Sequence, residues 1–464
     1  MHRWTIGSMA AVAALVLGAC GADGDDSAGG TTPDTGVPPT TGAPPEGTGG
    51  WIDGPPDWSG GGDEGAVADA LGGEVAEYES DDGVSAPRDT RASAGGGDVA
   101  VPEPVEPGPL RAGSVDDNTD FDRYLEYLAR VGSLGIPLRD FDPTGRIVVT
   151  ATGTTGLPVA GAEVVVMADG VEVARIRTTA DGTARFHPAL HGAAGATSFE
   201  FTTDGVSATA EPGGSVVLDL PGDGGAASPI PIDVLFLLDA TGSMGDEIDR
   251  LKTSIDSVAA RIAALESAPD VRFAMTLYRD EGDSFVTVTH DFTGDVDAFR
   301  AALAGVVADG GGDYPEALDE GLAEALAAPA WRDPASTVQL IFLVADAPPQ
   351  VARQVATPYP AAIADAVGRG IKIVPVASSE SDDQAEAVFL QLAQATGARF
   401  VFLSYGAGGA ATGGSTDIDR TDYEELALDD LVVRLVTEEL AALTGDPGQV
   451  PPPASTTTTV PDGQ

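Results

Sequence analysis

The stretch 231–245 constrains the fold of this chain more than any other. An uninterrupted apolar run, 234–238, ends on Asp239, and two hydroxyl residues follow at alternate positions, Thr241 and Ser243. A run of this kind is typical of a β-strand that is buried on both faces. The sequence therefore predicts a buried strand that ends on a carboxylate.

A long amphipathic segment comes directly after this strand. Its apolar residues recur every three or four positions, at Ile248, Leu251, Ile255, Val258, Ile262 and Leu265. That spacing predicts a helix with one buried face. One carboxylate and two hydroxyls are thus expected on a tight turn from strand to helix.

The side chains on this turn suit a divalent cation. Hard divalent cations prefer oxygen ligands in near-octahedral geometry. Alternate residues on a short turn can point the same way, so Asp239, Thr241 and Ser243 could offer three oxygens to one ion. The alternative is an aspartate that ends a strand and a serine that caps a helix. The turn alone leaves both interpretations open.

Two later segments carry further carboxylates. The loop 310–316 reads G-G-G-D-Y-P-E and contains Asp313 and Glu316, while the apolar run 338–345 is a second buried strand that is followed by Asp346. In open α/β sheets, sites form beyond the carboxyl ends of the strands, so these segments are expected to meet the first turn at one sheet edge. The alternative for the loop is that Asp313 caps a helix and Glu316 lies in its first turn.

These three motifs together resemble those of von Willebrand factor A domains, over a region from roughly Pro229 to Leu443. The resemblance implies a metal-ion-dependent adhesion site. In it, Asp239, Thr241, Ser243 and Asp346 would hold Mg²⁺ or Mn²⁺, with Ca²⁺ as an alternative.

The loop between these motifs departs from the common family pattern. Gly312 stands at the position where the family usually has a threonine ligand. The following segment, from Asp313 to Glu316, is similar to the integrin β-subunit variant, in which an Asp-x-Pro-Glu segment supplies carboxylates. The resemblance therefore implies that Asp313 or Glu316 completes the metal site.

The region 229–443 alternates apolar strands with amphipathic helices, which predicts an α/β fold: a doubly wound, mostly parallel sheet with helices on both faces. After the first helix, strands are expected at 271–278, 285–290, 338–345, from 371 and at 399–403, and helices at 296–307, 361–368, 384–396 and up to 443. The segment 404–421 is expected to be a loop because it is rich in Gly and Thr.

The N-terminus has the features of a targeting segment. His2 and Arg3 precede an apolar run, 9–17, which is too short to span a membrane comfortably, and the run leads into L-G-A-C at Cys20, the single cysteine of the chain. This pattern resembles the bacterial lipobox. The resemblance implies that residues 1–20 are a lipoprotein signal and that Cys20 is lipidated, which would anchor the protein on the outer face of the cell membrane. An ordinary cleaved signal peptide is the alternative.

The composition of the remaining segments separates those expected to be disordered from one expected to be helical. The segments 21–113 and 444–464 are rich in Gly, Pro, Thr and acidic residues, so they are expected to be disordered. The segment 114–135 is expected to form a short helix over 116–131, because its apolar residues have helical spacing.

The segment 140–221 is expected to be a small antiparallel β module. Asp169-Gly170 and Asp181-Gly182 are hairpin turn signals between its apolar runs. The segment 157–186 resembles carboxypeptidase-regulatory-like or other immunoglobulin-like sandwiches. The resemblance implies a spacer or a binding platform.

The charge of the chain excludes some partners. With 73 acidic and 24 basic residues, its formal net charge is −49, which argues against binding to nucleic acid or to anionic membrane surfaces. The chain has neither a G-x-S-x-G nor an H-E-x-x-H motif, so it is not expected to be an enzyme.

The sequence thus predicts an envelope-anchored lipoprotein that binds a protein or another ligand with an acidic group through its cation. The expected partner is an unidentified envelope or extracellular protein, one of whose carboxylates completes the coordination of the ion. Two alternatives stay open. One is a structural envelope protein in which the cation only stabilises the fold, and the other is a metal-dependent hydrolase.

Overall fold

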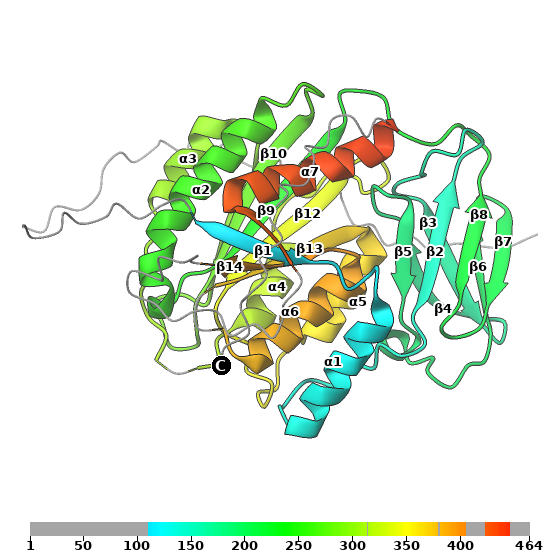
Figure 1. The fold of residues 1–464 in the computed structure, drawn as a ribbon, viewed down its shortest axis with the longest axis horizontal. Helices are drawn as coiled ribbons and strands as arrows, with labels where there is room; N and C mark the ends of the chain where they lie inside the picture. Colours follow the sequence, from blue (N-terminus) through cyan, green and yellow to red (C-terminus); the bar gives the residue numbers. More distant parts are fainter. Residues whose placement is uncertain (1–109, 313, 379–380, 405–422, 446–464) are drawn as a thin grey trace, which may run out of the picture. The chain divides into compact units, whose positions relative to one another are not determined.

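The structure is a computed structural model that describes residues 110–312, 314–378, 381–404 and 423–445 (Figure 1). The predictions for Cys20, for Asp313, for most of the segment 21–113 and for all but the first two residues of 444–464 therefore lie outside the described residues. No helix in these ranges is both long and apolar enough to cross a bilayer.

The large domain is built on a sheet whose eight described strands have the order β11-β10-β9-β12-β13-β14-β1-β15. Their bounds are β1 Arg111–Val115, β9 Pro231–Asp239, β10 Asp270–Tyr278, β11 Thr287–Thr293, β12 Val338–Ala345, β13 Ile371–Ala377, β14 Phe400–Ser404 and β15 Glu424–Ala427. Strands β10, β9, β12, β13 and β14 pair in parallel, whereas β11 and β1 run antiparallel to their neighbours. The sheet is therefore mostly parallel, as predicted.

Helices cover both faces of this sheet (Figure 1). Their bounds are α2 Gly245–Ala263, α3 Val296–Ala304, α4 Leu318–Ala327, α5 Tyr359–Arg369, α6 Asp383–Thr396 and α7 Leu428–Thr444. Successive residues of a strand point to opposite faces. Along β9, Val234 and Phe236 pack with α2, α3 and α7, whereas Leu235 and Leu237 pack with α4, α5 and α6. This two-sided burial explains why the strands read as uninterrupted apolar runs.

The predicted boundary of the N-terminal linker at residue 113 is wrong, because Arg111–Val115 form β1 within the large sheet. β1 lies between β14 and β15 and is antiparallel to both. Its sequence, RAGSV, has no strong strand pattern. It forms a strand because β14 would otherwise leave a row of unpaired backbone groups at a sheet edge. The sequence pattern also does not predict strand β15, which pairs with β1 among the strands that the structure describes.

The helix that follows starts later than predicted. Residues 114 and 115 belong to β1, and α1 covers Phe121–Leu134. The side chain of Asp120 caps α1 by accepting a hydrogen bond from the Arg123 backbone N–H at 3.3 Å. Helix α1 packs against α6 and buries Tyr124. The start of the helix thus follows its cap rather than the first acidic residues of the segment.

Residues 147–219 form a sandwich of two sheets, with the strand orders β5-β2-β8 and β4-β3-β6-β7. The bounds are β2 Ile147–Thr152, β3 Glu163–Ala168, β4 Val171–Arg177, β5 Thr183–Phe186, β6 Phe199–Thr203, β7 Val206–Ala210 and β8 Ser215–Asp219. Its buried residues join those of the α4, α5 and α6 face in one hydrophobic cluster. The sandwich and the large domain therefore share part of their core.

Two details of the sandwich differ from the prediction. Strand β8 pairs with β2 in parallel, so the module is not wholly antiparallel. The turn at Asp169-Gly170 joins the paired strands β3 and β4, but the turn at Asp181-Gly182 joins β4 to β5, which belong to different sheets. Lys372 of the large domain donates a hydrogen bond to Asp181, so the second turn has a tertiary role that a local hairpin pattern does not reveal.

Some other element ends also differ. Strand β11 begins two residues after the predicted strand 285–290 and extends to Thr293, because its limits are set by antiparallel pairing with β10. Helix α3 begins where predicted, after the capping residue Asp295, but ends at Ala304 rather than near residue 307.

Candidate metal centre

The carboxyl ends of β9 and β12 form the centre of the predicted site. The chain passes from β9 to β10 on one side and later returns to β12 on the other, so the strand order reverses between β9 and β12. Ligand sites of open α/β sheets lie at this kind of position. Val344 of β12 pairs with Leu238 of β9, so Asp239 and Asp346 lie at the ends of adjacent strands, which are about 4.8 Å apart.

The turn after β9 aligns three oxygens in a hydrogen-bonded row. The Thr241 hydroxyl donates to Asp239 Oδ1 at 2.6 Å, and the Thr241 and Ser243 hydroxyl oxygens are 3.2 Å apart. The Thr241 backbone N–H also donates to Asp239 Oδ1, at 3.0 Å. Asp239 and Thr241 are buried, whereas Ser243 is exposed. The row therefore runs from the core to the surface.

The capping alternative for this turn does not fit the structure. Helix α2 is preceded by Met244 at its N-cap position, and no side chain caps it there. The preceding short 3₁₀ helix, Gly242–Met244, begins after Thr241, whose side chain makes no cap hydrogen bond. The hydroxyls of Thr241 and Ser243 are therefore not used for helix capping.

Glu316 reaches the same place from the second loop. Its backbone N–H donates to the Pro348 carbonyl at 3.1 Å, which fixes the loop beside the end of β12. Helix α4 begins after Glu316 and Ala317, so the glutamate is not a residue of the first helical turn. A Cβ atom at Gly311 would lie 2.9 Å from Glu316 Oε1 and 3.2 Å from Thr241 Cβ. This glycine therefore allows the second loop to approach the first.

The segment after β10 holds the second loop in place. Asp283 accepts hydrogen bonds from the backbone N–H groups of Gly311 at 2.9 Å and of Asp280 at 3.0 Å. These two bonds lower the pKa of the Asp283 carboxyl. The sequence pattern does not mark Asp283 as part of the site. Its only signal was the cluster of acidic residues after β10, which is common on protein surfaces.

Arg279 fastens the same segment to the first turn. Its guanidinium donates to the carbonyl oxygens of Ala240 at 3.1 Å and of Val307 at 2.8 Å. Its ion pair with Asp309 is longer, at 3.6 Å. Arg279 thus ties together the turn after β9 and the start of the second loop. Neither local pattern nor spacing indicated this role.

Three carboxyl groups of the candidate site are buried and are not fully hydrogen-bonded. Asp239 Oδ2, Glu316 Oε2 and Asp346 Oδ1 have no hydrogen-bond partner among the described residues. Burial, reinforced by the neighbouring Asp239 charge, raises the pKa of Glu316 to about 8. Burial also raises the pKa of Asp239 and of Asp346, and the two carboxyls repel each other's charge. A cation or bound protons would relieve this repulsion.

The available ligands are oxygens only, which suits a hard divalent cation such as Mg²⁺ or Mn²⁺. In the described ranges, no three His, Cys, Asp or Glu side chains form a metal-binding group by themselves. A cation here would therefore rely on the hydroxyls of Thr241 and Ser243 besides the carboxylates. The side chains at this site therefore fit the divalent cation that the three sequence motifs imply.

We expect the cation-free chain to lose stability as the pH rises from about 4 to 8. The ordinary carboxyl pKa values are 3.8 and 4.5, and the folded values of Asp239, Asp346 and Glu316 are all raised. Their contribution to folding stability is full below the ordinary values and is lost as the pH rises through the folded ones.

The stabilisation that Mg²⁺ gives should increase as the pH rises, because the cation competes with protons for the carboxylates. Thermal scans at several pH values, with Mg²⁺ or with EDTA, measure both effects. The variant Asp239→Ala is the control for groups that titrate elsewhere in the chain. Its melting temperature in EDTA should change less with pH than that of the wild type. An EDTA melting temperature that rises over this range in the wild type, relative to the variant, would contradict the prediction.

A comparison with known families finds a match for the large domain. Residues 233–405 match the family model of the von Willebrand factor A domain. The predicted resemblance of the large domain is thereby confirmed, and so is the predicted α/β fold class with its mostly parallel sheet. The match does not extend to the sandwich or to the N-terminal region.

One curated relative is 33% identical over 86 residues. It is described as an ariadne-like RING finger protein of Acanthamoeba polyphaga mimivirus. The match covers 18% of this chain and 8% of that protein, so it concerns one small region of a much longer protein.

Several solved structures are similar to parts of the chain at low identity. A proximal thread matrix protein of the mussel byssus, described with zinc in its metal-ion-dependent adhesion site, is 14% identical, covers 36% of this chain and 40% of its own, and has a TM-score of 0.29. BatB of Bacteroides thetaiotaomicron is 14% identical, with 36% and 87% coverage and a TM-score of 0.28. The pilus adhesin SpaC of Lactobacillus rhamnosus GG is 12% identical, with 54% and 32% coverage and a TM-score of 0.31.

Proposed function

We propose that this protein is an envelope-anchored lipoprotein that binds a partner through a divalent cation held by the large domain. The partner would be an envelope or extracellular protein, or another ligand, that presents an acidic group. The observation that carries the proposal is the position of Asp239 and Asp346 at the ends of adjacent strands, where the strand order reverses.

The residues of the site have distinct roles in this proposal. Asp239 and Asp346 would hold the cation with charged oxygens, and Thr241 and Ser243 would contribute hydroxyls. Glu316, or Asp313 beside it, would complete the set from the second loop. The bound cation would supply an electrophilic position at which a partner's carboxylate can bind.

The membrane anchor belongs to the proposal as well. Cys20 is the sole cysteine of the chain and ends an L-G-A-C motif after a short apolar run. Acyl chains on this residue would contribute about 0.8 kcal/mol per buried methylene group to membrane binding. The acidic, Gly- and Pro-rich segment that follows would separate the folded part from the membrane surface.

Capture of envelope proteins tests the binding function. The immobilised full chain should retain one or more partners in Mg²⁺ or Mn²⁺ and release them in EDTA, and Asp239→Ala should retain none. Asp309→Ala is a matched control, because its carboxyl is near the site but mostly exposed. Cation-dependent stabilisation without any cation-dependent partner would favour the structural alternative. Cation-dependent hydrolysis that Asp239→Ala abolishes would favour the enzymatic one.

A further inference from the structure

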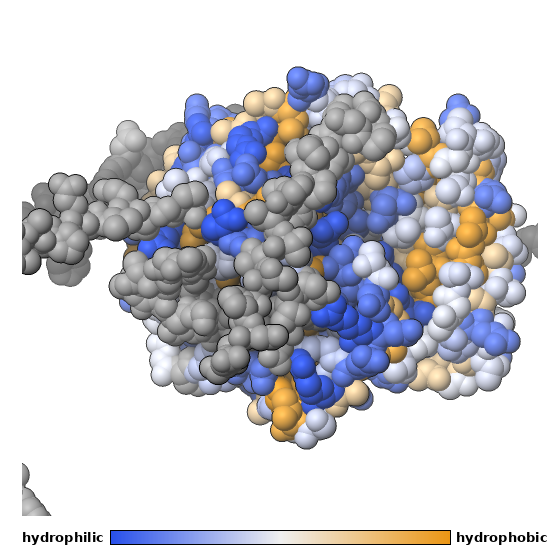
Figure 2. Space-filling view, viewed as in Figure 1, coloured by the Kyte–Doolittle hydropathy of each residue, from blue (hydrophilic) through white to orange (hydrophobic). Residues whose placement is uncertain are grey.

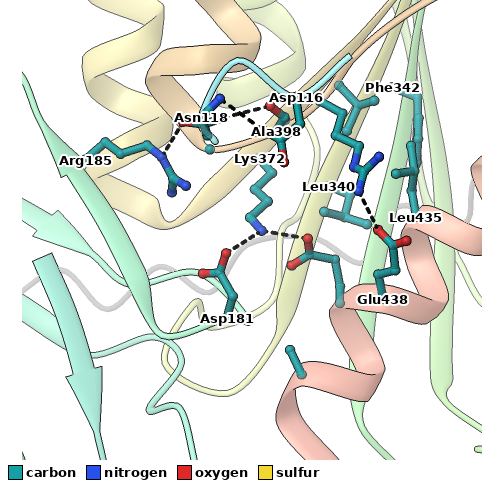
Figure 3. Close-up of a pocket in the computed structure, with 15 residues that line it drawn as sticks. Asp116, Asn118, Asp181, Arg185, Leu340, Phe342, Lys372, Ala398, Leu435 and Glu438 are labelled. Carbon is teal, nitrogen blue, oxygen red and sulfur yellow. Dashed lines mark hydrogen bonds and ion pairs between the residues drawn. The ribbon is translucent and has the colours of Figure 1, made fainter. Parts of the chain in front are cut away.

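A cavity of about 220 Å³ lies between the large domain and the sandwich, away from the metal centre (Figure 3). One of its lining residues, Lys372, lies near the start of β13, whereas the metal centre lies beyond the opposite ends of the parallel strands. Figure 2, in the same view as Figure 1, shows hydrophilic residues gathered between β1 and the sandwich. None of the functions proposed above uses the side chains of this cavity.

Lys372 lies between two carboxyl groups at the wall of the cavity. Its ammonium group donates to Asp181 Oδ2 at 3.1 Å and to Glu439 Oε1 at 2.6 Å. Figure 3 shows Lys372 directed towards Asp181. The Lys372 side chain is 6% exposed and the Glu439 side chain is 17% exposed. Lys372, Asp181 and Glu439 thus form one ion cluster, which joins the sandwich to β13 and α7.

The Asp181 carboxyl is held in one orientation through its other oxygen. Asp181 Oδ1 accepts hydrogen bonds from the Thr179 hydroxyl at 2.8 Å, from the Thr183 backbone N–H at 2.9 Å and from the Thr183 hydroxyl at 2.7 Å. These bonds leave Oδ2 to face the Lys372 nitrogen. Donors that are already in place around one oxygen are also what stabilises the negative charge that develops when a nucleophile attacks a carbonyl group.

Glu439 is suited to carry protons within the ion cluster. Its Oε1 contacts the Lys372 nitrogen, whereas its buried Oε2 has no hydrogen-bond partner among the residues that the structure describes. Burial raises the pKa of the Glu439 carboxyl. This carboxylate therefore accepts a proton from the ammonium group more readily than an ordinary glutamate would.

The ion cluster is charged at rest. Burial opposes the charge of Lys372, but the carboxylates of Glu439 and Asp181 outweigh it and raise the pKa of the ammonium group. Burial also opposes the charge of Asp181, but Lys372 and Arg185 outweigh it and lower the pKa of that carboxyl. A reaction between the lysine and the aspartate therefore needs a group that moves protons from one to the other, and Glu439 lies in the position for it.

We propose that Lys372 Nζ and Asp181 Cγ become joined by an amide bond, which Glu439 helps to form. The ammonium group gives one proton to Glu439, which passes it to Asp181 Oδ2. The uncharged nitrogen then attacks Cγ, and the negative charge moves to Oδ1, where the hydrogen bonds from Thr179 and Thr183 stabilise it. A second proton passes from the nitrogen through Glu439 to Oδ2, and this oxygen leaves as water.

The reaction needs no oxidant, cofactor or further reactant. One ammonium and one carboxylate become one amide and one water molecule, and Glu439 returns to the carboxylate form. Well-oriented groups of one molecule react at effective concentrations of about 10⁵ to 10⁸ M, which favours condensation. The water has a way out, because the Asp181 side chain is 36% exposed and lines the cavity.

The amide would join two positions that are 191 residues apart, one in the turn from β4 to β5 and one in β13. A cross-link that closes a long loop restricts the unfolded chain and thereby stabilises the folded one. The chain has a single cysteine, so an intramolecular disulfide cannot supply such a link. The amide would keep the sandwich fastened to the large domain even where their other contacts open.

Tryptic digestion of the denatured full chain, followed by mass spectrometry, tests the proposal. Trypsin does not cleave after an amide-linked lysine, so the wild type should yield the segment 178–185 joined to the segment 370–399, with one water molecule lost from their summed mass. Without the bond, 178–185 is released alone and cleavage after Lys372 separates 370–372 from 373–399. The proposal is overturned if the joined pair is absent from the wild type.

The digest also distinguishes the amide from a second product with the same mass. Asp181 precedes Gly182, and a succinimide ring between these two residues would lose one water molecule as well. The ring leaves Lys372 free, so trypsin would still cleave after it. Loss of water from the segment 178–185 alone, together with cleavage after Lys372, therefore overturns the proposal.

Variants assign the roles of the three residues. Glu439→Gln keeps the shape of the side chain but cannot accept a proton, so the joined fraction should fall at least about tenfold. Lys372→Met and Asp181→Ala should abolish the joined pair. Asp169→Ala is the matched control and should keep it, because Asp169-Gly170 is an exposed turn of the same sequence in the sandwich. If Glu439→Gln is joined as fully as the wild type, Glu439 carries no proton and that part of the proposal is wrong.

Stability measurements do not replace the digest. A loss of stability in Lys372→Met follows from the ion cluster as well as from the amide, because the variant removes both. The covalent structure of the wild type decides between them.

Discussion

Replacing Asp239 by alanine should abolish the stabilisation that Mg²⁺ or Mn²⁺ gives to the wild-type chain. A ligand that binds only the folded state stabilises it by about 2.7 kcal/mol at a concentration 100 times its dissociation constant. Asp239 is fully buried and lies between the Thr241 hydroxyl and the end of β12, so no other carboxylate can take its position. The whole cation-dependent gain should therefore be lost.

The cation-free form of Asp239→Ala should keep a melting temperature close to that of the wild type. The variant loses two hydrogen bonds that Thr241 donates to the carboxylate, each worth about 1 kcal/mol. It also loses a buried negative charge that raises the pKa of Asp346 and of Glu316. The lost bonds and the relieved repulsion have opposite signs and offset each other.

Thermal scans and calorimetry with each cation, and with EDTA, measure this difference. Asp309→Ala should respond to the cation like the wild type, because its carboxyl is mostly exposed. Glu316→Gln keeps the shape of the side chain and removes its charge, so it should weaken cation binding without abolishing it. A cation-dependent shift that persists in Asp239→Ala, or that is absent from the wild type, would disprove the site.

Replacing Lys372 by methionine should destabilise the protein by about 3 to 5 kcal/mol. Its ammonium group is buried and compensates Asp181 and Glu439, which approach it from the sandwich and from α7. Methionine fills similar space but leaves the carboxylates of Asp181 and Glu439 facing each other, and the Glu439 side chain is only 17% exposed. Removing one partner of a buried ion pair has a cost of this size because the remaining charge is uncompensated.

Chemical denaturation of the full chain measures the effect of Lys372→Met. Lys252→Met is a suitable comparison, since Lys252 pairs with the exposed Asp249 and such pairs contribute at most about 1 kcal/mol. A second replacement, Glu439→Leu, should restore part of the stability of Lys372→Met, because it removes one of the stranded charges. If Lys372→Met is as stable as Lys252→Met, the ion cluster does not hold the sandwich against the large domain.

The sequence by itself determined the fold class and placed four residues in the candidate metal centre. The α/β alternation is visible because strands that are buried on both faces give uninterrupted apolar runs, and helices that cover them give a 3.6-residue period. Asp239 and Asp346 could be predicted to meet because parallel strands bring their carboxyl ends to one edge. Thr241 and Ser243 follow Asp239 within four residues, so local spacing was sufficient for them.

Only the tertiary structure decided the features that depend on pairing between distant segments. Strand β1 has no pattern of its own and becomes a strand because β14 provides backbone groups to pair with. Asp283 reaches the second loop through backbone hydrogen bonds, which no side-chain pattern records. Arg146 and Arg185 are far apart in sequence and become neighbours because both donate to Asn118. Hydrophobic periodicity is a local property of the chain, whereas these contacts depend on which surfaces the folded elements bring together.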